Sequence, residues 1–139
     1  MDRKDVIELL DEAFYTEMRI LEDIIGGPYR NTAKGSLKVY QRSKLTEKCT
    51  SINCDNPDLI RWDHLQTKNL SMACVLDEPG HAILIIGSGT ARTNPAVVEL
   101  TAQNGQIEIL AWAKEGLIKQ RTAEKAVNAV RSVLECSEN

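Results

Sequence analysis

Hydrophobic spacing predicts one long helix near the start of the chain. Within residues 2–25, apolar side chains recur every three or four positions, and acidic side chains occupy the opposite face. Asp2 or Asp5 can cap its start. Gly26-Gly27-Pro28 can end it, because glycine accepts the left-handed conformation and proline cannot continue a helix. At the usual rise per residue this helix would be about 35 Å long, so we expect part of its apolar stripe to pack outside its own sheet.

Alternation replaces helical spacing over residues 34–45 and predicts a half-buried strand there. Leu37, Val39 and Leu45 fall on one side of this segment, and polar or basic residues fall on the other. A second strand is predicted near residues 46–53 on a weaker pattern.

A short helix is predicted to follow over residues 57–67. Asn56-Pro57-Asp58 is typical of a helix start, because asparagine caps well and proline fits the first turn. This helix would bury Leu59, Ile60, Trp62 and Leu65 in part.

The second half of the chain carries the strongest strand pattern. Four apolar segments are predicted as strands, at residues 72–76, 82–86, 96–101 and 106–111. A tight turn is expected at Glu78-Pro79-Gly80-His81, and a hairpin turn at Asn104-Gly105, where both positions tolerate positive φ. A final helix is predicted over residues 122–135 with Thr122 as its cap, while residues 112–119 fit either a longer strand or a helix start.

This order of elements predicts a single α+β domain over residues 1–139. It would contain a mainly antiparallel sheet of about five to six strands, a long N-terminal helix, a short middle helix and a C-terminal helix. Residues 82–86 are apolar on both faces, so that strand should be central and covered on both sides. Many unrelated functions use such an arrangement, so the fold class alone does not predict a function.

Composition narrows the class of protein without naming a function. The chain is 42% hydrophobic and 27% charged, as is ordinary for a globular protein. It has no apolar run of the length that a membrane helix needs and no visible secretory signal. We therefore expect a cytoplasmic protein whose four cysteines are reduced thiols and not a disulfide framework.

Charge is unevenly distributed, and this produces the first candidate site. Residues 1–25 carry eight acids and three bases, whereas residues 30–48 carry six bases and one acid. On the predicted strand, one face would present Lys34, Lys38, Tyr40, Arg42 and Lys44. Cations spaced along a strand beside an aromatic ring suit an anionic ligand or a single-stranded nucleic acid. A solvated edge strand, or ion pairs to the acidic first helix, would explain the same charges without binding.

A second candidate is the polar loop after the central strand. Ser88, Thr90 and Arg92 could hold a phosphate or carboxylate with the help of exposed amides. The match to known phosphate-binding fingerprints is poor, because Pro95 and another strand follow where a helix would be needed.

Metal and catalytic chemistry have little support in the sequence. Cys49, Cys54, His64, Cys74 and His81 include zinc-ligand types, but their spacing fits no compact zinc site. We expect Cys74 and Cys136 to act as small core residues. No catalytic motif is present, so we predict no catalytic residue, no metal and no cofactor, although distant residues could still converge into an active site.

The sequence therefore favours a small regulatory or interaction module without catalysis of its own. Its partner would be another protein or a small ligand met at the sheet, and the long amphipathic first helix favours a homodimer. Binding of an anionic ligand or nucleic acid through the segment 34–44 is the alternative, and a small enzyme is the second alternative. No membrane association is expected.

Overall fold

The computed structural model describes residues 1–26, 32–68, 72–88, 94–116 and 120–138 of the chain. Its elements, in chain order, are α1 (Arg3–Ile25), α2 (Thr32–Gln41), β1 (Lys44–Asn53), the 3-10 turn η2 (Pro57–Ile60), α3 (Trp62–Leu65), β2 (Met72–Glu78), β3 (His81–Ser88), β4 (Asn94–Gln103), β5 (Gln106–Glu115) and α4 (Thr122–Glu138). The strands form one sheet in the order β1-β5-β4-β3-β2, and every neighbouring pair is antiparallel. The predicted α+β class and the mainly antiparallel sheet are confirmed.

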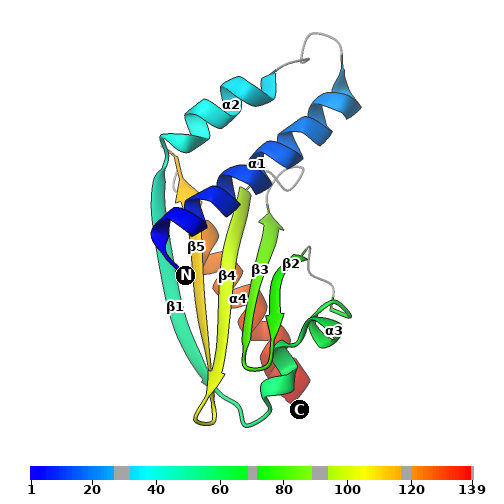
Figure 1. Ribbon diagram of the computed structural model, residues 1–139, viewed down its shortest axis with the longest axis vertical. Coiled ribbons are helices and arrows are strands. Elements are labelled where there is room, and N and C mark those ends of the chain that lie inside the picture. The colour runs from blue at the N-terminus through cyan, green and yellow to red at the C-terminus, as the bar shows by residue number, and fades with distance from the viewer. Residues whose placement is uncertain (27–31, 69–71, 89–93, 117–119, 139) are drawn as a thin grey trace.

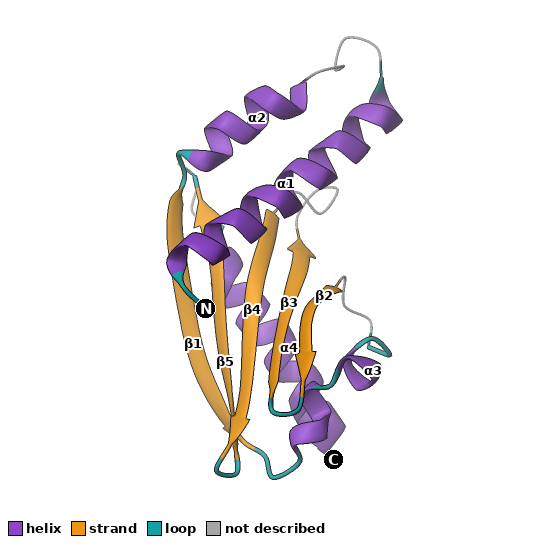
Figure 2. Ribbon diagram, viewed as in Figure 1, coloured by secondary structure: helices purple, strands orange, loops and turns teal. Residues whose placement is uncertain are grey.

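Helices cover both faces of this sheet. Figure 1 shows α1 crossing one face diagonally, while α4 runs along the opposite face. Helix α2 folds back beside α1, and η2 and α3 lie near the β2 end of the sheet (Figure 2). The sheet therefore has an α1 side and an α4 side, and the two differ in how completely they are covered.

The ends of α1 follow the residues that predicted them. The Asp2 carboxylate accepts a hydrogen bond from the Asp5 N–H at 2.9 Å, so Asp2 is the cap. Gly26 ends the helix at a φ of 61°, and its N–H donates to the Glu22 carbonyl at 2.8 Å. The left-handed conformation at Gly26 explains why the helix ends there.

The prediction of a strand over residues 34–45 is wrong, because this segment contains α2 and β1 begins only at Lys44. The apolar residues of the segment also fit helical spacing, and packing against α1 selects the helix. Tyr40 is buried and stacks on Phe14 of α1 with ring centroids 4.1 Å apart. The buried Glu22 carboxylate accepts from the Ala33 N–H at 2.5 Å and so satisfies the start of α2.

The remaining elements lie close to their predicted positions. Asn104 and Gly105 have φ values of 54° and 73°, as the hairpin turn between β4 and β5 requires. The predicted helix over residues 57–67 is present as two short pieces, η2 and α3, and Asn56 caps the first by accepting from the Asp58 N–H at 3.1 Å. Strand β5 continues to Glu115, and residues 117–119 lie outside the described part of the chain.

Helix α4 begins at Thr122 as predicted, but its first backbone donors are satisfied from the sheet. The Glu115 carboxylate at the end of β5 accepts from the N–H groups of Gln120 at 2.8 Å and Thr122 at 2.9 Å. This contact joins the end of the last strand to the start of the last helix.

The sheet separates two hydrophobic clusters. The larger one lies on the α4 side, between the sheet and α4 with η2 and α3. The smaller one lies on the α1 side, and its buried members are Val6, Leu10, Tyr40, Ile83, Val97 and Trp112. Strand β3 is an inner strand that contributes to both clusters, as predicted, but its α1 face is covered only in part.

Candidate functional site

Helix α1 covers only part of its side of the sheet. Its buried residues Val6 and Leu10 pack in the cluster with Val97 and Trp112, and its main contacts with the sheet are to β4 and β5. The helix passes above the sheet diagonally, and its second half lies beside α2 (Figure 1). The part of the α1 side formed by β3 and β2 is therefore left partly open.

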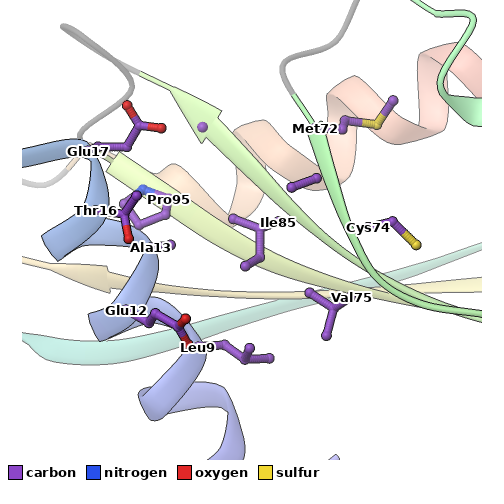
Figure 3. Close-up of a pocket in the computed structure, with 12 residues that line it drawn as sticks. Leu9, Glu12, Ala13, Thr16, Glu17, Met72, Cys74, Val75, Ile85 and Pro95 are labelled. Atoms are coloured by element: carbon purple, nitrogen blue, oxygen red, sulfur yellow. The ribbon is translucent and has the colours of Figure 1, made fainter. Parts of the chain in front are cut away.

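A groove lies in this open part, between α1 and the edge strand β2. It has a volume of about 440 Å³. Its lining residues are Leu9, Glu12, Ala13, Thr16 and Glu17 from α1, Met72, Ala73, Cys74 and Val75 from β2, and Ile85, Gly87 and Pro95 from β3 and β4. We call it the α1–β2 groove. Figure 3 shows the α1 side chains facing Ile85 and Val75 across it.

Strand pairing explains why apolar side chains point into the groove. Ala73 pairs with Ile85, and Leu76 pairs with Ile83, which belongs to the α1-side cluster. Directly paired residues of antiparallel strands share a face, so all four lie on the α1 side. A register shift between Cys74 and Leu76 forms a bulge around Val75, whose side chain is 40% exposed.

The groove continues toward the start of α1 as an acidic hollow. This second hollow, of about 430 Å³, shares Leu9 and Glu12 with the groove. Its other lining residues are Met1, Asp5, Glu8, His81, Ile83 and Glu99. No lysine or arginine occurs among the described residues that line either hollow.

The carboxylates of this surface differ in their partners. Glu99 accepts a hydrogen bond from His81 Nε2 at 2.7 Å, and the Met1 ammonium lies 3.7 Å away. Glu8, Glu12 and Glu17 form no ion pair within the described residues. The α1 wall of the groove and of the acidic hollow thus carries three carboxylates that form no ion pair within the described residues, beside an apolar floor.

Acidic residues also occupy the neighbouring part of the open sheet face. Glu108 pairs with Thr101, which pairs with His81, so these residues share the α1 side. Burial raises the pKa of the Cys49 thiol, and the nearby carboxylates Glu108 and Glu47 raise this pKa further. Glu47 and Glu108 are thus further carboxylates on the α1 side of the sheet.

A second cavity, on the other side of α1, is already engaged by internal contacts. It has a volume of about 530 Å³. It is lined by Phe14, Ser36, Val39, Tyr40, Ser43, Asn94, Lys114, Glu115, Gly116 and Gln120. We call it the Tyr40 cavity. Its charged groups have partners, because the Lys114 ammonium donates to Asp11 and to the Gln41 carbonyl, and Glu115 accepts two backbone N–H groups.

Tyr40 was predicted to present its ring to a ligand, but it is buried in this cavity. Its hydroxyl is buried and has no hydrogen-bond partner among the described residues. Burial, and then the nearby Asp11 carboxylate, raise the pKa of Tyr40 well above its usual range. The Lys114 ammonium lies 5.2 Å from the centre of its ring. Tyr40 is thus a packing residue and not an exposed stacking platform.

The basic residues predicted to share a strand face are not brought together as predicted. Lys34 and Lys38 are exposed on α2, whereas Tyr40 points into the α1-side cluster. Arg42 follows the helix, and Lys44 begins β1. A strand face made by these five residues does not exist, because the segment is helical over most of its length.

The predicted polar loop is only partly described. Ser88 is the last residue of β3 and pairs with Asn94, and neither lines the α1–β2 groove. Thr90 and Arg92 lie outside the described residues, so the predicted phosphate site stays a prediction.

The described cysteines differ in their exposure to solvent. Cys54 is buried, but Cys74 is exposed on β2, so the prediction of a core role for Cys74 is wrong. Cys74 is exposed because β2 is an edge strand. The apolar composition of the segment did not show that this strand would lie at the edge of the sheet. Cys136 lies in α4, and its side chain is outside the described set. Among the described residues, no group of three or more His, Cys, Asp or Glu side chains could hold a metal ion.

The sequence missed the α1–β2 groove because its residues come from separate segments. The spacing of Glu8 and Glu12 on the polar face of a helix was visible, but the strand that α1 would face was not. No helix in the described residues has both the length and the apolar character needed to cross a membrane.

Comparison with known proteins adds no functional information. No family model matches the sequence, and neither the curated proteins nor the solved structures give a match.

Proposed function

We propose that this chain is a non-catalytic interaction module that binds a segment of a partner protein in the α1–β2 groove. The observation that carries the proposal is the unequal covering of the sheet. The α4 side is covered by α4, η2 and α3, whereas the α1 side leaves Val75, Ile85 and Leu9 around an open groove. Exposed apolar side chains that line a concave surface are typical of binding sites.

The groove is a better candidate than the Tyr40 cavity. The charged groups of the Tyr40 cavity are held by internal contacts, as the Lys114 and Asp11 pair at 3.3 Å shows. Glu12 and Glu17 of the groove form no ion pair within the described residues, and Ala73 and Val75 of β2 are exposed. A partner can therefore gain both burial and ion pairs in the groove.

A second copy of the chain does not suit this groove. A symmetric contact would bring Glu8, Glu12 and Glu17 of both copies together, and like charges repel at such an interface. The same charges oppose a nucleic-acid phosphate backbone. Homodimerisation stays a prediction for another surface, and native mass spectrometry of the whole chain measures it directly.

The proposal can be tested by NMR with a 14-residue amphipathic peptide, a length set by about four helical turns. The peptide carries leucine and alanine on one face and glutamine on the other. We expect shifts of backbone amides in β2, in β3 and between Leu9 and Glu17. Val75→Asp should abolish them, because a charge would then lie in the apolar part of the groove.

Val39→Asp is the matched control. Val39 is also an exposed valine, at 67%, but it lies on α2 outside the groove. This variant should bind the peptide as the unmodified chain does. Equal loss of binding in both variants, or no shifts at millimolar peptide, would overturn the proposal.

A further inference from the structure

We infer that the partner segment is a cationic amphipathic helix of about three turns that lies over β2, beside α1. The inference rests on the proposed function and names the chemistry of the occupant. Its basis is the combination of an apolar floor, a row of unpaired carboxylates and the spacing between α1 and the sheet edge.

Packing distances favour a helix in this position. Helix α1 packs mainly on β4 and β5, and β2 is two strands away from β4. Neighbouring strands are about 4.8 Å apart, so β2 lies roughly 10 Å from β4. Packed helices have interaxial distances of about 8–10 Å. Where α1 lies over β4, a second helix packed against it would therefore lie above β2 and extend the layer on the α1 side.

Addition of a strand at the free edge of β2 is less suitable. The bulge between Cys74 and Leu76 interrupts the regular ladder that an added strand would need. Asp77, near the end of this short strand, is held by Arg61 and the Trp62 N–H, and Glu78 adds an exposed acid beside it, so this end is unsuited to pairing. A helix satisfies its own backbone hydrogen bonds and needs no ladder.

The length of the acidic row sets the length of the helix. The carboxylates of α1 that line the two joined hollows extend from Asp5 to Glu17. At about 1.5 Å per residue, this row is roughly 18 Å long, which corresponds to about three turns of a partner helix.

Charge complementarity sets the polar face of the partner. Glu8 and Glu12 are one turn apart and exposed, and Glu17, about 140° further round the helix, also lines the groove. Lysine or arginine at matching intervals on the partner helix would pair with them. His81 and the Met1 ammonium are both at Glu99, so they do not neutralise this row.

Three fluorescent peptides with the same apolar face test the inference. Their polar faces carry lysine, glutamine or glutamate. By fluorescence anisotropy we expect the lysine peptide to bind roughly tenfold more tightly than the glutamine peptide. The glutamate peptide should bind least. Circular dichroism should show helix formation when the lysine peptide binds.

The variant with Glu8→Gln and Glu12→Gln should bind the lysine peptide roughly tenfold more weakly and lose most of the salt dependence. Its binding of the glutamine peptide should be unchanged. The variant with Glu124→Gln and Glu135→Gln on α4 removes the same net charge from the opposite side and should bind as the unmodified chain does.

The possible failures have different meanings. If the lysine and glutamine peptides bind equally, the charge assignment is overturned and the proposed function stands. Binding without a gain of helix overturns the helical occupant alone. If none of the three peptides binds in the groove, the proposed function itself fails.

Discussion

Single side chains in this protein carry connections between elements that are far apart in the sequence. The Asp77 carboxylate of β2 accepts hydrogen bonds from Arg61 Nε at 2.9 Å and from the Trp62 N–H at 3.1 Å. These bonds hold the start of α3 against the edge strand. They lower the pKa of Asp77, the Arg61 hydrogen bond being the largest cause and the Trp62 hydrogen bond the second.

Replacement of Asp77 by asparagine tests this attachment. A carboxyl group with a lowered folded-state pKa contributes stability above its unfolded pKa of about 3.9, and this contribution is lost as pH falls through the folded-state pKa. We expect Asp77→Asn to lower the urea midpoint at neutral pH. The difference from the unmodified chain should shrink as the pH falls below about 4.

The exposed Asp23 provides the control for this experiment, because its side chain forms no ion pair or hydrogen bond with another described residue that Asp23→Asn would remove. A difference between Asp77→Asn and the unmodified chain that stays constant from neutral to acid pH would show that the ionised carboxylate is not what stabilises the contact.

At the scale of elements, local sequence patterns were sufficient to predict those helices and turns whose ends are set by their own capping and turn residues. Helix α1, the Asn104-Gly105 hairpin and the start of η2 follow capping and turn residues that can be recognised without tertiary contacts. Segment 34–45 was different. Its Leu37 and Tyr40 fit a strand or a helix, and only Phe14 and Glu22 of α1 decide between them. The groove depends on where α1 crosses the sheet, which no short pattern contains.

Two glycines provide a matched test of these elements. Gly35 lies within α2, and a Cβ added there meets no atom within 4 Å. Gly35→Ala should therefore stabilise the chain by roughly 0.5–1 kcal/mol, because alanine has the higher helix propensity. Gly105 has a φ of 73°, and an added Cβ would lie 2.9 Å from Asp55 Oδ1. Gly105→Ala should destabilise by about 1 kcal/mol or more.

Denaturant unfolding followed by circular dichroism measures both free energies. Destabilisation by Gly35→Ala would contradict the assignment of residues 32–41 to a helix. No effect of Gly105→Ala would mean that the hairpin turn adopts another conformation in solution.

At the scale of the whole molecule, the two sides of the sheet are stabilised by different means. The α4 side has the larger cluster of buried apolar residues. The α1 side has a smaller cluster. Helices α1 and α2 form a helical hairpin on this side, which extends beyond the sheet and leaves Ile20, Ile24 and Ile25 exposed. Besides the apolar contacts of this cluster, Lys114 of β5 bonds to both helices of the hairpin. Its side chain is 3% exposed and donates to Asp11 of α1 at 3.3 Å and to the Gln41 carbonyl of α2 at 3.2 Å.

We therefore expect Lys114→Met to weaken the α1 side selectively. It leaves the Asp11 carboxylate without its partner, and the loss should be about 2–3 kcal/mol, less than for a fully buried pair because Asp11 is 20% exposed. Hydrogen exchange should become faster in α1 and α2 than in α4, because the Lys114 side chain bonds to Asp11 of α1 and to Gln41 of α2. Adding Asp11→Asn should restore part of the stability, since no unpaired charge then remains.

The elements that lose hydrogen-exchange protection in Lys114→Met show whether α1, which forms one wall of the groove, can move independently of the rest of the fold. If protection falls equally on both sides of the sheet, the hairpin and the α4 side unfold together, and α1 cannot adjust alone. If protection falls mainly in α1 and α2, the wall of the α1–β2 groove is attached to the sheet through a few contacts. A partner that packs against Glu8, Glu12 and Val75 should then slow exchange in α1 even in the Lys114→Met chain, because it would contact the helix and the sheet together.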